Sequence, residues 1–558
     1  MIKLLKYTMV GALAFGMVSC DLDMLPETTM TDVDYWKTEG DLRGACNRFY
    51  QQMSGSLGGF YQDYRSDELV ESGKINSISD GSRVVPSTAD DWSNPYKRIF
   101  IANNIIEKAP RAAVSEKVLN RYLAEAYFFR AFHYFELVKK YGDVPLLMKA
   151  VSDTQDPILS MPRTPREQVI QQCYTDLTFA VDNLPDIDHL DAWGHISRSA
   201  ALAMIVRVGL YEGTYSKHHN LPANNANEHL QKAISAAETM INVDKKHALY
   251  PDFQKLFYYD GEGRQNKENV FVRTFGPNDS PVSGNNQTHN HSRYLENYTT
   301  LTRNMVDLFL YTDGLPREKS PLRITPEVHF DDIFVNRDPR LGMTIYKTGE
   351  DAYKGAYMPM VHRFGYNIKK GFMLSDWPSN MAVVDKMVIR YAEVLISYAE
   401  ALYEKNGAIT DAQLDMTVNA IRERAGMPAK LTNAFVAANG LDMLEEIRRE
   451  RTIEFIDENK RYDDIIRWSI AEDVLPTYLL GAKYNEEDTN VRPEEVQDRL
   501  TKDGGMYNGK KVHDEDGIYV LEMAEDRRFD VAKDYLYPVP LKEITLSGNT
   551  VTQNPNWE

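Results

Sequence analysis

The residues of this 558-residue chain that come closest to catalytic chemistry are carboxylates at helical spacing. Polar residues of segment 390–404 recur at steps of three and four: Arg390, Glu393, Ser397, Glu400 and Glu404. Paired carboxylates are the acid/base groups of a glycoside hydrolase, and we keep that activity as an alternative. Segment 441–468, however, is rich in arginines, whose planar guanidinium groups bind carboxylates with two hydrogen bonds. We therefore expect some of these arginines to pair with carboxylates of 390–404 between packed helices, as structural ion pairs.

Long loops carry the residue types of a sugar-binding surface. Segments 60–91, 276–300 and 353–381 are polar and too long to be simple connections. Aromatic faces beside planar polar groups suit a sugar, which presents C–H faces ringed by hydroxyls. Our candidate ligand contacts in these loops are Arg65, Arg83, Trp92, Asn285, Tyr294, Arg363, Tyr366 and Trp377. For each aromatic ring the alternative is packing within its own loop, and Trp92 stands directly before a predicted helix.

Other chemical motifs are weak. His289 and His291 lack a third ligand, so we interpret them as polar surface rather than a metal site. Acidic residues from Asp514 onward match three positions of a calcium-binding loop, but Tyr519 occupies the position that requires glycine. The sequence contains no glycine-rich phosphate loop and no nucleophile elbow. We predict no catalytic residue, no metal and no cofactor.

The elements that must position these loops are mostly helices. Apolar residues of 390–404 follow the helical period, and a second helical pattern over 411–424 completes an αα-hairpin of the kind that stacks. Further helices are predicted over 41–53, 94–109, 115–141, 164–183, 197–216, 226–243 and 302–310, and a short strand over 268–275. Small residues in 197–216 allow close helix contact. The predicted fold class is mainly α, with helical hairpins, long irregular loops and a few short strands.

Composition restricts the partners. The 82 acidic residues exceed the 64 basic ones, and the net charge of −18 makes nucleic acid an unlikely ligand because phosphate backbones are repelled. Cys46 and Cys173 lie in helical patterns, which favours buried free thiols. A disulfide between them stays open at this point.

The N-terminus predicts export. Two lysines precede an apolar run over 7–18 that is shorter than the roughly 20 residues needed to span a bilayer. Small residues before Cys20 are similar to a bacterial lipobox, although Met17 replaces the usual leucine. We predict a lipoprotein signal over 1–19, lipidation of Cys20 and a tether over 20–31. An ordinary signal peptide is the alternative.

Motifs spread along the chain support a family resemblance. They are DYWKTEGDLRGACNRFY at 34–50, ANNIIEKA at 102–109, YLAEAYFFRAFHYFELVKKYGDVPLL at 122–147, TDGLP at 312–316, RDPRL at 337–341, RYAEVLISYAEAL at 390–402, IRERAGMP at 421–428, RRERTIEFIDENKRYDDIIRW at 448–468, and the terminal YLYPVPLKEI and QNPNW. With the lipobox-like cysteine, this set resembles the SusD/RagB family of Bacteroidota outer-membrane nutrient-binding lipoproteins.

The resemblance implies an architecture and a biological role. It implies about four TPR-like helix pairs, with an N-terminal helical part over 32–250 and a C-terminal part over 251–558. The latter would comprise loops over 251–385, helices over 386–470 and an irregular end. It further implies lipid anchoring in the outer membrane, surface exposure, and a SusC-like TonB-dependent transporter as partner. The expected ligand is a glycan bound without chemistry, in regions that include the long loops. Peptide binding of the RagB type and a TPR-type assembly scaffold are the alternatives.

Overall fold

A computed structural model describes residues 35–51, 53, 63–71, 76–153, 155–221, 225–275, 289–290, 299–352, 355–359, 365–375 and 381–557. Its helices are α1 Glu39–Gln51, α2 Asp90–Lys108, α3 Glu116–Tyr141, α4 Arg166–Asn183, α5 Arg198–His218, α6 Ala226–Glu238, α8 Arg303–Val306, α9 Pro339–Thr344, α10 Tyr391–Asn406, α11 Asp411–Met416, α12 Val418–Arg424, α13 Asn433–Asn439, α14 Met443–Glu454, α15 Arg461–Arg467, α16 Ala471–Val474 and α17 Leu541–Leu546. The predicted mainly α fold is confirmed.

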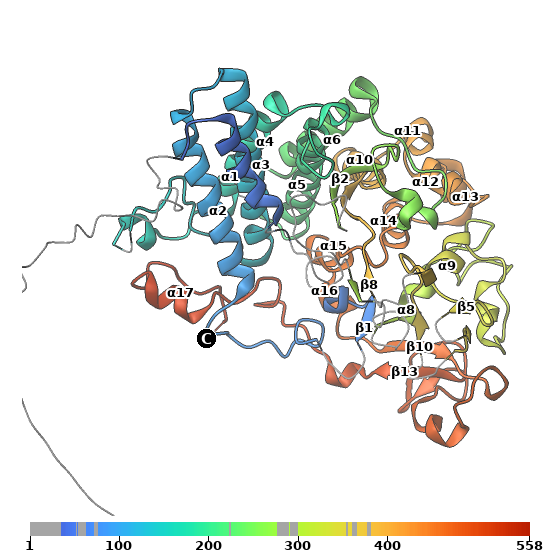
Figure 1. The fold of residues 1–558 in the computed structure, drawn as a ribbon. Helices are drawn as coiled ribbons and strands as arrows, with labels where there is room; N and C mark the ends of the chain where they lie inside the picture. Colours follow the sequence, from blue (N-terminus) through green and yellow to red (C-terminus); the bar gives the residue numbers. More distant parts are fainter. Residues whose placement is uncertain are drawn as a thin grey trace, which may run out of the picture.

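The strands are short. They are β1 Leu69–Glu71, β2 Asn269–Arg273, β3 His289–Asn290, β4 Thr299–Leu301, β5 Asp351–Ala352, β6 Gly355–Ala356, β7 Tyr366–Asn367, β8 Met381–Ala382, β9 Lys386–Arg390, β10 Leu479–Lys483, β11 Met506–Tyr507, β12 Lys510–Lys511 and β13 Ile518–Glu522. All the described pairs are antiparallel, and β1, β4 and β7 form a three-stranded sheet. In Figure 1 helices α1 to α6 lie on one side, and the loop-rich segments with short strands lie on the other.

The helices stack in series. Each of α2 to α5 packs on the next helix along the chain, and α10 continues the series by packing on α5, α6 and α14. Helix α3 is buried nearly all round, as its aromatic sequence predicts. Gly209 and Gly213 of α5 let α6 approach closely, since a Cβ at Gly209 would stand 2.6 Å from the His229 carbonyl oxygen. The small-residue prediction for 197–216 is confirmed.

Helix α10 is held by the ion pairs predicted from its polar stripe. Arg467 donates to both oxygens of Glu400, at 2.6 and 2.8 Å. Arg448 donates to Glu404 at 2.9 Å. All four side chains are at least nine-tenths buried, so these pairs lie inside the helix array rather than on a solvated face. Arg448 and Arg467 are therefore structural partners of α10, as predicted for some arginines of 441–468.

Two segments depart from continuous helix. The helix predicted over 411–424 is wrong in one respect, because it breaks at Thr417 into α11 and α12. The Thr417 hydroxyl donates to the Gln413 carbonyl at 2.6 Å, a local bond that competes with helix geometry. Between α14 and α15, Asp457 and Asn459 take φ values of 61° and 60°, a conformation that Asp and Asn tolerate better than most residues. This turn reaches the candidate site described below.

Distant segments tie the two halves together. Strand β9, which leads into α10, pairs with β2 so that Asn269 faces Arg390. The proline-containing C-terminal segment returns to the end of α3, where the Tyr537 amide donates to the Lys140 carbonyl at 2.7 Å. Asn554 donates to the Tyr141 carbonyl at 3.1 Å. The end of α3 is therefore fixed by residues from the far end of the chain.

Both cysteines of the helical part are free thiols. The Cys46 sulfur donates to the Tyr122 carbonyl at 3.6 Å, and the Cys173 sulfur donates to the Ala131 carbonyl at 3.6 Å. Burial raises the pKa of each thiol well above its ordinary value. Among the described residues, no helix is both long and apolar enough to cross a membrane.

Candidate ligand-binding site

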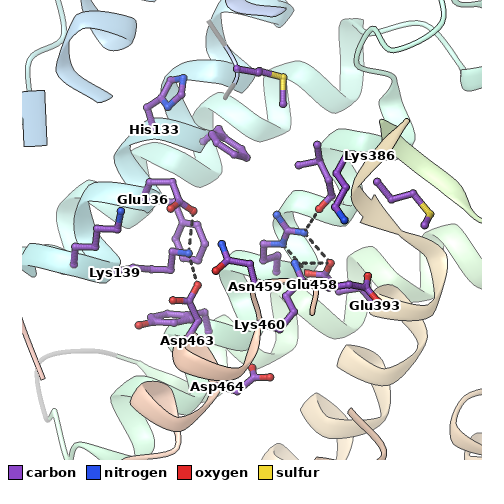
Figure 2. A pocket seen from close by; sticks show the side chains of 18 of the residues that line it. His133, Glu136, Lys139, Lys386, Glu393, Glu458, Asn459, Lys460, Asp463 and Asp464 are labelled. Carbon is purple, nitrogen blue, oxygen red and sulfur yellow. Dashed lines mark hydrogen bonds and ion pairs between the residues drawn. The ribbon is translucent and has the colours of Figure 1, made fainter. Parts of the chain in front are cut away.

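A cavity of about 760 Å³ lies between the helix array and the turn that follows α14. Its volume is within the range of about 300–1,000 Å³ that is usual for small-molecule sites. Helices α2, α3, α5 and α10, segment 384–388, the 457–460 turn and the start of α15 all contribute to its wall. Figure 2 shows charged side chains from these elements converging on it.

One side of the cavity centres on Glu393 of α10. Arg207 of α5 donates to both oxygens of Glu393, at 2.6 and 2.7 Å, and the Lys460 ammonium lies 3.1 Å away. Burial opposes ionisation of Glu393, but Arg207 and Lys460 outweigh it and hold its pKa well below the usual range. Burial and the Arg207 charge lower the pKa of Lys460 to about 8. The result is a charged group held rigidly in the wall.

The opposite side centres on Lys139 of α3. Its ammonium lies 2.9 Å from Glu136 and 2.5 Å from Asp463, as Figure 2 shows. Burial opposes ionisation of Asp463, but Lys139 and Arg65 lower its pKa to about 2. Arg65 also donates to the Asn459 side chain at 2.8 Å. The positive-φ turn after α14 thus supplies polar groups to the cavity.

Apolar rings complete the wall. Phe129, Phe132 and Phe135 on α3 and Tyr211 on α5 line the cavity beside the ion pairs. His133 also lines it, and burial followed by the Arg98 charge lowers its pKa well below the ordinary value, so the imidazole is neutral at pH 7. Rings next to fixed hydrogen-bonding groups are the combination that a ligand with apolar faces and a hydroxyl rim requires.

Four carboxylates of the cavity wall do not suit acid catalysis. A glycoside hydrolase needs one carboxyl group with a raised pKa to protonate the leaving oxygen. Burial acts in that direction here, yet neighbouring cations lower the pKa of Asp91, Glu393, Glu458 and Asp463. These groups are ionised acceptors. The described residues contain no cluster of three or more His, Cys, Asp or Glu side chains able to hold a metal ion.

Family models place this architecture among known proteins. Residues 256–557 match the SusD family model, and residues 22–210 match a model described as starch-binding associating with outer membrane. The chain belongs to the SusD family. SusD-like protein P2 of Formosa agariphila is 26% identical over the full length of both chains. A SusD-like protein of Bacteroides ovatus is 23% identical over 99% of this chain and 96% of its own.

Solved SusD-like structures share the fold. A SusD-like carbohydrate binding protein from Bacteroides fragilis has a TM-score of 0.73 at 23% identity, over 92% of this chain and 98% of its own. A laminarin binding SusD-like protein has a TM-score of 0.62 at 20% identity, over 93% of this chain and 100% of its own. The expected TPR-like helical scaffold of the SusD family is confirmed.

Of two predicted arginine contacts, Arg65 lies in the cavity wall and Arg83 does not. Arg65 lines the cavity and stacks over the Tyr462 ring, with 4.6 Å from its guanidinium carbon to the ring centre. Arg83 lies outside the cavity wall and donates to the Asp534 carbonyl at 2.6 Å. Its guanidinium also faces the Tyr537 ring at 4.8 Å. Arg83 therefore ties the first loop to the C-terminal segment.

Two predicted aromatic contacts are buried instead of exposed. Trp92 is 4% exposed and packs edge-on against Tyr141, with 4.9 Å between ring centres. Tyr366 is fully buried, and its hydroxyl accepts a hydrogen bond from Arg303 at 3.2 Å. The expectation of ligand-facing rings is wrong for both. The helix containing Trp92 begins at Asp90, so the ring belongs to a packed helix and not to the loop.

The remaining predicted site residues lie outside the described residues. They are the lipidation candidate Cys20 and the loop candidates Asn285, Tyr294, Arg363 and Trp377.

The cavity residues other than Arg65 were missed by sequence reasoning. Glu393 was recognised as part of a polar stripe, but its partner Arg207 lies in another helix with no local signal linking the two. Lys139 ends a helix whose aromatic residues dominate its pattern, so its two acidic partners could not be anticipated. The one usable signal was the charge density around 457–464, in the segment that forms the turn.

Proposed function

We propose that this protein is a non-catalytic, lipid-anchored lipoprotein of the outer-membrane surface, which captures oligo- or polysaccharide for a SusC-like TonB-dependent transporter. The observation that carries the proposal is the match of residues 256–557 to the SusD family model. The outer-membrane description of the second model and the laminarin binding of a structural neighbour support a glycan ligand and this location. Cys20, at the end of the signal-like segment, is the proposed lipidation site.

The cavity supports capture without chemistry. Ion pairs such as Arg207–Glu393 and Lys139–Asp463 fix the acceptor oxygens before a ligand arrives, which limits the ordering cost of binding. Phe132, the partly exposed ring of α3 in this wall, would cover the apolar face of a sugar, and the carboxylates would accept hydrogen bonds from its hydroxyls. Lowered pKa values keep these carboxylates as acceptors rather than proton donors. Asn285, Tyr294, Arg363 and Trp377 remain proposed loop contacts.

This proposal can be tested by calorimetric titration of residues 21–558 against plant, host and microbial oligosaccharides and a mixed peptide pool. Binding of a glycan without release of new reducing ends is the expected result. Glu136→Ala, which removes a partly exposed acceptor at the cavity wall, is expected to weaken binding by about 1 kcal/mol or more. The control is Glu228→Ala, which removes a carboxylate from an exposed helical pair with Lys232.

The other outcomes separate the alternatives. A peptide hit without any glycan hit would favour the RagB-type function, which the mixed charges of the cavity wall also accommodate. New reducing ends would favour hydrolysis. If Glu136→Ala and Glu228→Ala affect glycan binding equally, the glycan binds outside the cavity. Co-purification of the full-length protein with a barrel transporter would test the proposed partner.

A further inference from the structure

A second, smaller pocket lies among the loops that join α4 to α5 and α6 to β2. It has a volume of about 70 Å³, and it shares no lining residue with the large cavity. Its wall is formed by Ile187, Asp188, Trp193, Lys246, His247, Arg264, Asn266, Lys267 and Asn269. The side chains of Asp188, Lys246 and Lys267 are 36–49% exposed, so the pocket has a rim at the protein surface.

Three side chains of this wall have buried polar atoms without a hydrogen-bond partner among the residues that the structure describes. They are the Trp193 indole nitrogen, the His247 Nε2 atom and the Asn269 Oδ1 atom. Asn269 is 2% exposed, and its amide nitrogen donates to the carbonyls of Gly261 and Gly263, which leaves the oxygen as the free acceptor. A buried polar atom without a partner costs about 1–3 kcal/mol, so three in one wall favour a ligand that pairs with them.

The protonation of His247 defines the pattern further. Its Nδ1 atom lies 3.0 Å from the Lys267 carbonyl oxygen, which can only accept, so Nδ1 carries the hydrogen. Burial lowers the pKa of His247 to about 4, and the ring is neutral at pH 7 with Nε2 as an acceptor. The pocket therefore offers two acceptors, Nε2 and the Asn269 oxygen, and one donor, the Trp193 indole.

The rim adds positive charge in an acidic protein. Lys246 and Lys267 both bind Asp188, at 2.8 and 3.1 Å. Arg264 lies over the Trp193 ring, 6.0 Å from its centre. Three cations thus face one lining carboxylate, in a chain of net charge −18. Outside the wall, Asp186 and Asp244 also act electrostatically on Lys246, and Asp244 is paired with Arg198.

We infer that this pocket is a subsite for an acidic sugar residue, a uronate, whose carboxylate pairs with Lys246, Lys267 and Arg264 while its hydroxyls donate to Asn269 and His247. The two acceptors disfavour a fully deprotonated anion such as sulfate, which has no hydrogen to donate. The cations disfavour a purely neutral sugar as the best ligand. Trp193 is the half-buried ring that the sugar edge meets, and its N–H completes the donor set.

The inference rests on the proposed carbohydrate-binding function for its ligand class. An amino acid could also present a carboxylate and hydrogen-bond donors, but its ammonium group would need an available carboxylate. The lining carboxylate Asp188 is shared by two lysines. The volume admits only one edge of a sugar, since a single water occupies about 30 Å³ in the liquid. The pocket would therefore bind the acidic end or an acidic branch of a longer glycan.

Titration of the ¹⁵N-labelled protein with glucuronate and with glucose tests the inference, because the two sugars differ only in the carboxylate. The indole N–H signal of Trp193 is assigned by its loss in Trp193→Phe. Glucuronate is expected to shift this signal saturably, and glucose to do so at least about tenfold more weakly. Lys246→Gln and Arg264→Gln should each weaken glucuronate binding about fivefold, as for the loss of a partly exposed ion pair. Lys430→Gln, which breaks the exposed pair with Asp415, should leave binding unchanged.

Several results would overturn the inference. They are equal shifts with glucose, a stronger response to glycine than to glucuronate, no saturable shift, or a crystal soaked in glucuronate that shows ordered water only beside Trp193. If the wild-type protein binds oligosaccharide while its Trp193 signal ignores glucuronate, this subsite fails and the proposed function stands. If glucuronate binds at Trp193 but no oligosaccharide binds the protein, the proposed uptake function fails and the subsite stands.

Discussion

Replacing Glu400 by glutamine is expected to destabilise the protein strongly, although the two side chains have nearly the same shape. Glu400 is fully buried and accepts two hydrogen bonds from Arg467, at 2.6 and 2.8 Å, and one from the Trp468 indole at 2.6 Å. The variant leaves the Arg467 guanidinium buried with only Asp464 as its carboxylate partner. Breaking a buried pair on one side typically costs about 3–5 kcal/mol.

The unfolding temperature at pH 7 measures this cost. With an unfolding entropy of about 2.1 cal/mol/K per residue, a loss of 3–5 kcal/mol lowers the midpoint by about 3–4 °C in a chain of this length. Asp415→Asn is the control, because its pair with Lys430 is more than half exposed and should contribute little to stability. Equal, small shifts for Glu400→Gln and Asp415→Asn would refute the scaffold role of the α10 carboxylates. They would also reopen a catalytic interpretation of Glu400.

Three further predictions follow from packing and burial. Gly209→Ala should lower the unfolding free energy by about 1–3 kcal/mol, because the new Cβ would meet the α6 backbone. Gly40→Ala in α1 has room for a Cβ and should be neutral or stabilising. Thermal unfolding of both variants tests this, and equal effects would contradict the close packing of α5 on α6. Burial raises the pKa of Asp63 to about 7, compared with about 4 in the unfolded chain, so ionisation of the buried carboxyl destabilises the fold increasingly as the pH rises from 4 to 7. Asp63→Asn should therefore stabilise the protein by about 1–3 kcal/mol at pH 8 but not at pH 4. A stability difference that does not depend on pH would contradict this. Cys46 and Cys173 should resist a thiol reagent in the native 21–558 chain and react on unfolding, and fast native labelling would show that the helix array opens.

Helices and their ion pairs were predictable because both depend on local spacing. The Arg390 and Glu400 positions repeat with the helical period, and the arginines that bind Glu400 and Glu404 lie within the same 79-residue region, 390–468. The chemistry of guanidinium and carboxylate then limits the partners to a few choices. The break at Thr417 was not predictable from periodicity, because the apolar pattern continues through it, whereas the Thr417 backbone angles are not helical and its hydroxyl donates to the Gln413 carbonyl.

The candidate cavity was not predictable because its wall is non-local. Arg207 and Glu393 are 186 residues apart, and Lys139 and Asp463 are 324 apart. No spacing rule relates such residues until the helices are stacked. Arg65 was found for a different reason: its loop was long and polar, and that property alone marked it as a candidate.

The fate of the aromatic candidates shows why loop composition is a weak guide to a ligand site. A ring gains free energy by leaving water whether it packs on the protein or on a sugar, so the same residue type serves both purposes. Trp92 and Tyr366 have aromatic or arginine neighbours that already cover them. Trp193 differs because its indole nitrogen has no hydrogen-bond partner in the described part of the chain and its loop also brings it to a positively charged rim. An unpaired polar atom on a half-buried ring is a better indicator of ligand binding than the ring itself, because burial without a partner is unfavourable unless something else completes it.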